Sequence, residues 1–137
     1  MKEITVPART DELDRVLDFI SEQLEEYGCP MKYLMQIQVA AEEIYVNIAH
    51  YAYHPDEGLA TIRCTVGGEP LEVSITFLDN GRPYNPLAQE DPDVTLSAEE
   101  RRIGGLGVYM AKNLMDGISY RSENGCNILT INKLLAE

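Results

Sequence analysis

The chain has 137 residues, 45% of them hydrophobic and 25% charged, which predicts one globular domain over residues 1–137 and not a disordered chain. The formal net charge of -12 argues against nucleic acid and anionic membranes as partners, because both carry negative charge themselves. An anionic ligand would need a metal cation or backbone N–H groups to balance its charge, although a merely soluble surface explains the acidity equally well.

The first part of the chain predicts a short strand and then a helix. Residues 2–6 favour the strand. Apolar residues then recur every three or four positions up to about residue 27, which is typical of an amphipathic helix. We expect Thr10 or Asp11 to cap this helix and Gly28 to end it.

The strongest helical pattern covers residues 31–51, and Pro30 suits the first turn of this second helix. Two alternating patterns follow, over residues 61–66 and 71–77, and each predicts a strand with one buried face. The glycine-rich segment 67–70 between them indicates a hairpin.

Regular patterns disappear over residues 79–103, a proline-containing and acidic stretch. Loops of this length are uncommon in compact domains unless they are functional or disordered. A capping-box pattern at residues 97–100 predicts one short helix within it. The remaining chain predicts a helix and two strands, over residues 105–115, 118–122 and 126–133.

This order of elements predicts an α/β (α+β) two-layer sandwich. Hairpin-joined strands favour a mixed but largely antiparallel sheet. The amphipathic helices would cover one face of that sheet.

Three cysteines occur without disulfide-like or metal-binding spacing, which fits a reducing compartment. The N-terminus has no apolar signal core, and no stretch is apolar for long enough to span a bilayer. We therefore expect a cytoplasmic protein.

A polar strip runs along the predicted helix 31–51. Glu43 and Asn47 are four residues apart and share a face, with Gln36 one heptad before and His50 three residues after. The carboxylate suits a general base, and the amide oxygen is a hard ligand suited to Mg²⁺. A solvated helix face is the alternative interpretation, because the spacing by itself is a weak pattern.

Asp79 follows the second hairpin strand in the same phase as its core residues. A buried carboxylate is costly without a partner, so Asp79 is a candidate acceptor for an amino group on a flat heterocycle. Asn80 and Gly81 follow it and allow a close backbone approach. The alternative is an aspartate that only hydrogen-bonds its own turn.

Gly104, Gly105, Leu106 and Gly107 stand at the predicted start of the helix 105–115. Free N–H groups at a glycine-rich helix start form an anion site. The pattern is neither a Rossmann nor a Walker motif, and a simple hinge is the alternative. Arg101 and Arg102, just before it, either reach a phosphate or balance the glutamates beside them.

Taken in this order, the motifs resemble those of the GHKL ATPase superfamily, whose domain has the Bergerat or histidine-kinase-like fold. Glu43 and Asn47 resemble its N box, Asp79 with Gly81 its G1 box, and residues 104–107 its G2 box. Residues 82–104 resemble its ATP lid. Within the superfamily the chain is most similar to the bacterial anti-sigma-factor serine/threonine kinases, and the likeness spans nearly the whole chain.

The resemblance implies ATP and Mg²⁺ as cofactors and assigns roles to residues. Asp79 would bind the adenine amino group and Gly81 would let the base approach. Asn47 would coordinate Mg²⁺, and Glu43 would be the catalytic base. The candidate nucleotide-binding residues are Asn47, His50, Asp79, Gly81, Arg102, Gly104, Gly105, Leu106, Gly107 and Thr130.

The resemblance further implies a protein serine/threonine kinase that phosphorylates an anti-anti-sigma (STAS-type) partner and regulates transcription by partner switching. A sigma factor is a second candidate partner, and such kinases commonly form homodimers. Residues 84–86 read Tyr-Asn-Pro where the family often has Phe-Asp-Pro, which changes local charge. The alternatives are a non-catalytic, nucleotide-gated binding regulator and a detached histidine-kinase-like ATPase domain.

Overall fold

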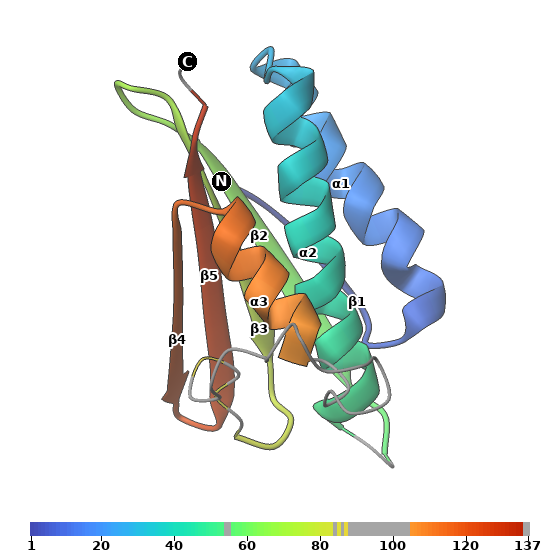
Figure 1. Ribbon diagram of the computed structural model, residues 1–137. Helices are drawn as coiled ribbons and strands as arrows, with labels where there is room; N and C mark the ends of the chain where they lie inside the picture. The colour runs from blue at the N-terminus through green and yellow to red at the C-terminus, as the bar shows by residue number, and fades with distance from the viewer. Residues whose placement is uncertain (54–55, 84, 86, 88–104, 136–137) are drawn as a thin grey trace.

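Five strands and three α-helices make up this computed structural model (Figure 1), which describes residues 1–53, 56–83, 85, 87 and 105–135, with the backbone alone at residues 105–108. The predicted helix at residues 97–100, Arg101, Arg102, Gly104 and most of the expected lid lie outside the described residues. In chain order the elements are β1 (Lys2–Pro7), the 3-10 helix η1 (Thr10–Glu12), α1 (Leu13–Glu26), α2 (Met31–Tyr51), β2 (Leu59–Gly67), β3 (Glu72–Asp79), α3 (Gly105–Leu114), β4 (Gly117–Glu123) and β5 (Cys126–Leu134).

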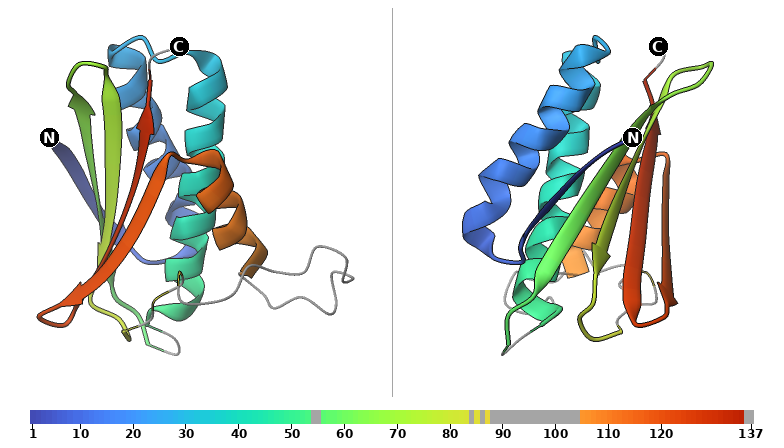
Figure 2. Two further views of the ribbon diagram at one scale, coloured as in Figure 1. Left: turned by 60° about the vertical axis from the view of Figure 1, so that its left-hand side comes forward. Right: turned by 180° about the vertical axis from the view of Figure 1, so that it is seen from behind.

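The strands form one sheet in the order β1-β2-β3-β5-β4. Every described pair of neighbours is antiparallel. All three α-helices lie on one face of this sheet, with α2 between α1 and α3 (Figure 2). The predicted two-layer α/β sandwich is confirmed, and the described strands and α-helices lie close to the predicted ranges.

The start of the first helix differs from the prediction. Neither Thr10 nor Asp11 caps it, because residues 10–12 form the 3-10 turn η1 and the cap residues of η1 and α1 make no side-chain cap hydrogen bond. Arg9 instead pairs with Asp11 at 3.2 Å and with Glu12 at 3.7 Å. The predicted end is confirmed, since Gly28 has φ +69° and its N–H donates to the Glu25 carbonyl at 3.0 Å.

The core lies between the helices and the covered face of the sheet. Val73, Ile75 and Phe77 of β3 face α2, whose buried stripe includes Ile37 and Ile44. Burying such a side chain contributes about 1.5–3 kcal/mol relative to leaving it exposed. This packing fixes α2 over the middle of the sheet, and with it the polar residues on the helix's second half.

Tyr45 ties α2 to the end of β1. Its ring is fully buried, and its hydroxyl donates to the Pro7 and Arg9 carbonyls at 3.0 and 2.8 Å. Burial raises the pKa of this phenol, so it stays a neutral donor at physiological pH. These bonds fix the rotation of α2 about its own axis.

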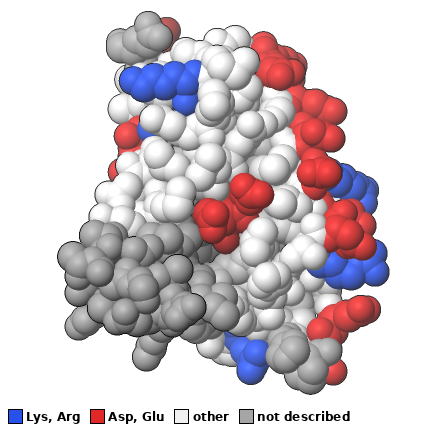
Figure 3. All heavy atoms as spheres, turned by 45° about the vertical axis from the view of Figure 1, so that its right-hand side comes forward, with Lys and Arg blue, Asp and Glu red and all other residues white. Residues whose placement is uncertain are grey.

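Acidic side chains gather on the side of the molecule where α1 lies (Figure 3). This helix carries Asp14, Asp18, Glu22, Glu25 and Glu26 and a single basic residue, Arg15. Such a surface repels polyanions, in agreement with the inference from net charge. Within the part of the chain that the structure describes, no helix combines the length and apolar character needed to cross a bilayer.

Candidate functional site

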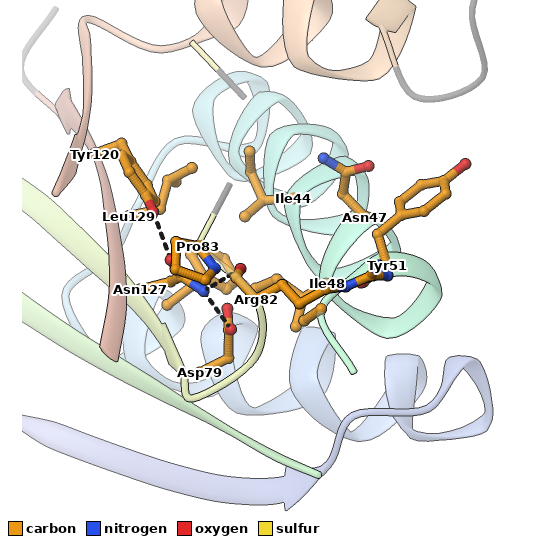
Figure 4. Close-up of a pocket in the computed structure, with 12 residues that line it drawn as sticks. Ile44, Asn47, Ile48, Tyr51, Asp79, Arg82, Pro83, Tyr120, Asn127 and Leu129 are labelled. Atoms are coloured by element: carbon orange, nitrogen blue, oxygen red, sulfur yellow. Dashed lines mark hydrogen bonds between the residues drawn. The ribbon is translucent and has the colours of Figure 1, made fainter. Parts of the chain in front are cut away.

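A cavity of about 390 Å³ opens between the second half of α2 and the adjoining ends of β3, β4 and β5 (Figure 4). Small-molecule sites commonly have volumes of about 300–1,000 Å³ and a mostly apolar lining with a few polar groups. The lining follows this pattern and consists of Ile44, Asn47, Ile48, Tyr51, Ala52, Phe77, Asp79, Arg82, Pro83, Tyr120, Asn127 and Leu129.

Asp79 stands on the floor of this cavity. The alternation of β3 buries it in phase with Val73, Ile75 and Phe77, as predicted, and leaves it 7% exposed. Its Oδ1 accepts hydrogen bonds from the backbone N–H of Gly81 and from Nδ2 of Asn127, both at 2.9 Å. Among the described residues no donor reaches Oδ2. The prediction of an aspartate bonding its own turn therefore holds for one oxygen only.

Asn127 is the polar cavity residue that the sequence analysis missed. The register of β3 and β5 places it directly opposite Asp79, and it is 7% exposed. Its amide also donates to the Arg82 carbonyl at 2.9 Å, and its Oδ1 accepts from the Tyr120 hydroxyl. The available signal was its phase with Leu129 and Ile131, the buried residues of the same strand.

Thr130 does not belong to this cavity, which corrects the expectation that it helps to hold a base. Side chains alternate along β5, so Thr130 points away from Asn127 and Leu129. Its hydroxyl bonds that of Thr76 at 3.1 Å, on the face of the sheet that the described helices leave uncovered.

The segment after Asp79 is fastened to the end of α2. A Cβ on Gly81 would lie 2.2 Å from the Ala52 carbonyl oxygen, so only glycine fits, and the close approach is to the helix. The Arg82 N–H donates to the same carbonyl at 2.8 Å, and its guanidinium donates to the Tyr51 carbonyl at 3.1 Å. A cation at a helix C-terminus is favourable. Gly81 and Arg82 thus hold the rim of the cavity.

Tyr53 adds a second fastening beside Asp79. Its hydroxyl accepts from the Asn80 N–H at 2.8 Å and donates to the Leu59 carbonyl at 2.6 Å. Burial raises the pKa of this phenol, which keeps it a donor. The turn that follows Asp79 is therefore fixed to the start of β2 as well as to α2.

Three residues of the predicted polar strip on α2 have different environments. Asn47 lines the cavity. Glu43 lies one turn earlier, half-buried and outside the lining, and burial raises the pKa of its carboxyl, with the neighbouring Glu42 raising it further. His50 is exposed and makes an edge contact with the Tyr51 ring, so the structure does not place it among the cavity residues.

The predicted glycine-rich helix start is confirmed at α3, which begins at Gly105. In Figure 1 this helix runs beside α2 with its N-terminal end directed toward the end of the sheet where β3 finishes. The backbone N–H groups of Gly105, Leu106 and Gly107 are therefore in the first turn, where helices bind anions. At the other end, the buried Lys133 donates from Nζ to the Leu114 carbonyl at 2.7 Å, which anchors α3.

The arrangement suits an uncharged, flat group at the Asp79 end and an anion toward α3. A magnesium ion fits this donor set, since Mg²⁺ binds phosphate oxygens and waters with only one or two protein oxygens, and Asn47 offers one. Groups of three or more His, Cys, Asp and Glu side chains that form an all-protein metal site are absent from the described residues.

The sequence matches the family model of the histidine kinase-like ATPase domain over residues 6–133. Similar proteins include the serine/threonine-protein kinase BtrW of Bordetella bronchiseptica, 30% identical over 95 residues that cover 69% of this chain and 66% of the relative. The serine-protein kinase RsbW of Bacillus mycoides is 24% identical over 131 residues, covering 93% of this chain and 81% of the relative.

The fold is also similar to a solved structure, that of the RsbU and RsbW domains of a Mycobacterium tuberculosis protein. The TM-score is 0.67 at 16% identity, over 100% of this chain and 33% of the other. At this identity the likeness concerns the fold alone. The family match, however, covers nearly every element described above, from β1 to β5. The chain belongs to the histidine kinase-like ATPase domain family.

Proposed function

We propose that this chain binds Mg²⁺-ATP in the cavity beneath α2 and transfers the γ-phosphoryl group to a serine or threonine of a protein partner. The observation that carries the proposal is Asp79, a buried carboxylate at the cavity floor with one oxygen that no described residue satisfies. A ligand that covers this oxygen removes it from water and must therefore supply a donor. The adenine amino group supplies one.

The phosphates would lie toward α3. The first-turn amides of α3, at Gly105 to Gly107, would bind phosphate oxygens, and the helix dipole favours their negative charge. Asn47 would hold Mg²⁺ beside the phosphates. The charge of the ion would offset the repulsion between the phosphates and an acidic protein. Gly104 and Arg102, outside the described residues, are proposed contacts by family resemblance.

Glu43 would act as the general base on the attacking hydroxyl. Its raised pKa makes the carboxylate a better base. Phosphoryl transfer depends mostly on positioning and charge neutralisation, so a base, a metal ligand and amide donors are sufficient machinery.

The names of the relatives support the kinase part of the proposal. The similar proteins from Bordetella bronchiseptica and Bacillus mycoides are named serine/threonine- and serine-protein kinases. By this resemblance we propose an anti-anti-sigma (STAS-type) protein as the phosphorylated partner, a sigma factor as a second partner, a homodimer as the working form, and the cytoplasm as its place.

The test is incubation of the chain with labelled ATP, Mg²⁺ and a cognate anti-anti-sigma protein. Label on a serine or threonine of that protein is expected, and chelation of Mg²⁺ should abolish it. ATP binding without any label on the partner would refute the kinase function.

One observation favours a second function, a nucleotide-gated regulator that sequesters its partner without phosphorylating it. Glu43 lies outside the cavity lining, whereas Asp79 and Asn47 belong to it. A regulator needs those two residues and no base. Partner capture that depends on ATP and is unaffected by Glu43→Ala would identify this function.

A further inference from the structure

We propose that Asn127 is a positioning residue for base recognition: its amide fixes the orientation of Asp79, and Tyr120 fixes that amide. The cavity then selects a purine that carries an exocyclic amino group where the base meets Asp79. This inference rests on the proposed ATP-binding function and names the residues that set its base specificity.

The orientation of the Asn127 amide is determined by its neighbours. Its Nδ2 faces three acceptors, namely Oδ1 of Asp79 at 2.9 Å, the Arg82 carbonyl at 2.9 Å and the Gly81 carbonyl at 3.4 Å. An amide turned the other way would set its own oxygen against all three. On the other side, Oδ1 of Asn127 meets the Tyr120 hydroxyl, which donates to it.

The fixed amide makes the two oxygens of Asp79 unequal. Oδ1 accepts from both Asn127 and the Gly81 N–H, while Oδ2 receives no donor from the described residues. Figure 4 shows the row of hydrogen bonds that runs from Tyr120 through Asn127 to Asp79. The carboxylate is thereby held on one side and presents its other oxygen for a ligand.

Three strands contribute to this row. Tyr120 comes from β4, Asn127 from β5 and Asp79 from β3, and the register pairs Asp79 with Asn127 across the sheet. Strand pairing holds these positions more rigidly than loops would. The row therefore acts as a preorganised acceptor, which a ligand need not reorganise on binding.

An acceptor that is held in place discriminates between bases, because a base without a matching donor leaves the acceptor unsatisfied. A base that lacks the amino group would leave Oδ2 desolvated and without a donor. A base with a carbonyl at that position would set two acceptors against each other. If Asn127 did not hold Asp79, the carboxylate could turn toward its own backbone and the discrimination would weaken.

The experiment measures the affinity of the full chain for ATP and for purine riboside triphosphate, which lacks only the 6-amino group, by titration calorimetry with Mg²⁺. For the unmodified chain we expect ATP to bind about 10- to 100-fold more tightly. Asn127→Leu should reduce that ratio to about threefold or less. Tyr120→Phe, a milder change, should reduce it partly. Thr76→Val is the matched control, because it removes a hydroxyl from the opposite face of β3 and should leave the ratio unchanged.

The ratio separates positioning from mere structural support, since a general loss of stability weakens both ligands equally. An unchanged ratio in Asn127→Leu, or in Tyr120→Phe if the first variant does not fold, would overturn the inference while ATP binding stands. Equal affinity of the unmodified chain for the two ligands would overturn it as well. Absence of binding to either would refute the proposed function itself and the inference with it.

Discussion

The cavity has two different ends. At the end near Asp79, called the base end here, side chains from three strands hydrogen-bond one another. At the α2 end, nearer α3, the polar side chains of the helix have no such partners among the described residues. Asp79, Asn127 and Tyr120 form the first group, and Glu43 and Asn47 the second. In the proposed function, the first end binds the base, and the second offers its oxygens to an ion and to the reacting groups.

If the proposed function holds, this difference separates binding from chemistry. Changes at the base end should remove nucleotide affinity, and a change of Glu43 at the α2 end should remove phosphoryl transfer while binding persists.

Glu43→Gln should lower the rate of phosphoryl transfer by about 10²- to 10⁴-fold, because it removes the proposed general base. Since Glu43 lies outside the cavity lining, ATP affinity should stay within a few-fold of its original value. Single-turnover transfer and calorimetry measure the two quantities. Glu42→Gln, which changes the adjacent carboxylate, is the control and should keep transfer at pH values above the acid limb of the rate. Rapid transfer by Glu43→Gln would exclude Glu43 as the base.

Asp79→Asn should weaken ATP binding by about 100-fold, because the amide cannot satisfy both its protein donors and the adenine amino group. Calorimetric titration with Mg²⁺-ATP measures the loss. Asp14→Asn on the exposed surface of α1 is the matched control. Full affinity in the Asp79 variant would place the base elsewhere.

Gly81→Ala should lower the free energy of unfolding by about 1–3 kcal/mol, since the added methyl meets the Ala52 backbone 2.2 Å away. Urea denaturation measures the loss. Gly67→Ala is the control, because nothing lies within 4 Å of its Cβ position, and it should change stability far less. Equal effects of the two changes would mean that the segment after Asp79 does not pack closely against the end of α2.

Glu42→Gln should shift the acid limb of the transfer rate to lower pH, which is the smallest effect. The Glu42 carboxylate raises the pKa of Glu43, so its removal lowers that pKa and keeps the base deprotonated at more acidic pH. A pH profile of single-turnover transfer detects the shift. A limb that moves to higher pH would contradict the assignment of the limb to Glu43.

Much of this arrangement was predictable from local patterns. The alternation of β3 predicted the inward phase of Asp79, and the apolar stripe of α2 predicted both the helix and the shared face of Glu43 and Asn47. The helix start at Gly105 followed from its glycines. These features depend on residues close together in the chain.

The omission of Asn127 and the two errors have different causes. Asn127 approaches Asp79 only because β5 pairs with β3 in one register, which no local pattern specifies. Thr130 was assigned by family likeness, although its phase opposes that of Leu129 and Ile131. Thr10 and Asp11 have the right chemistry for a cap, but a 3-10 turn begins the helix there instead.

The most direct test of the central claim is a crystal structure of the chain with a non-hydrolysable ATP analogue and Mg²⁺. The account predicts the adenine amino group within hydrogen-bond distance of Oδ2 of Asp79, with Asn127 still bonded to Oδ1 and the phosphates at the N-terminus of α3. A base bound outside this cavity, or an Asp79 whose Oδ2 stays without a ligand contact, would contradict it.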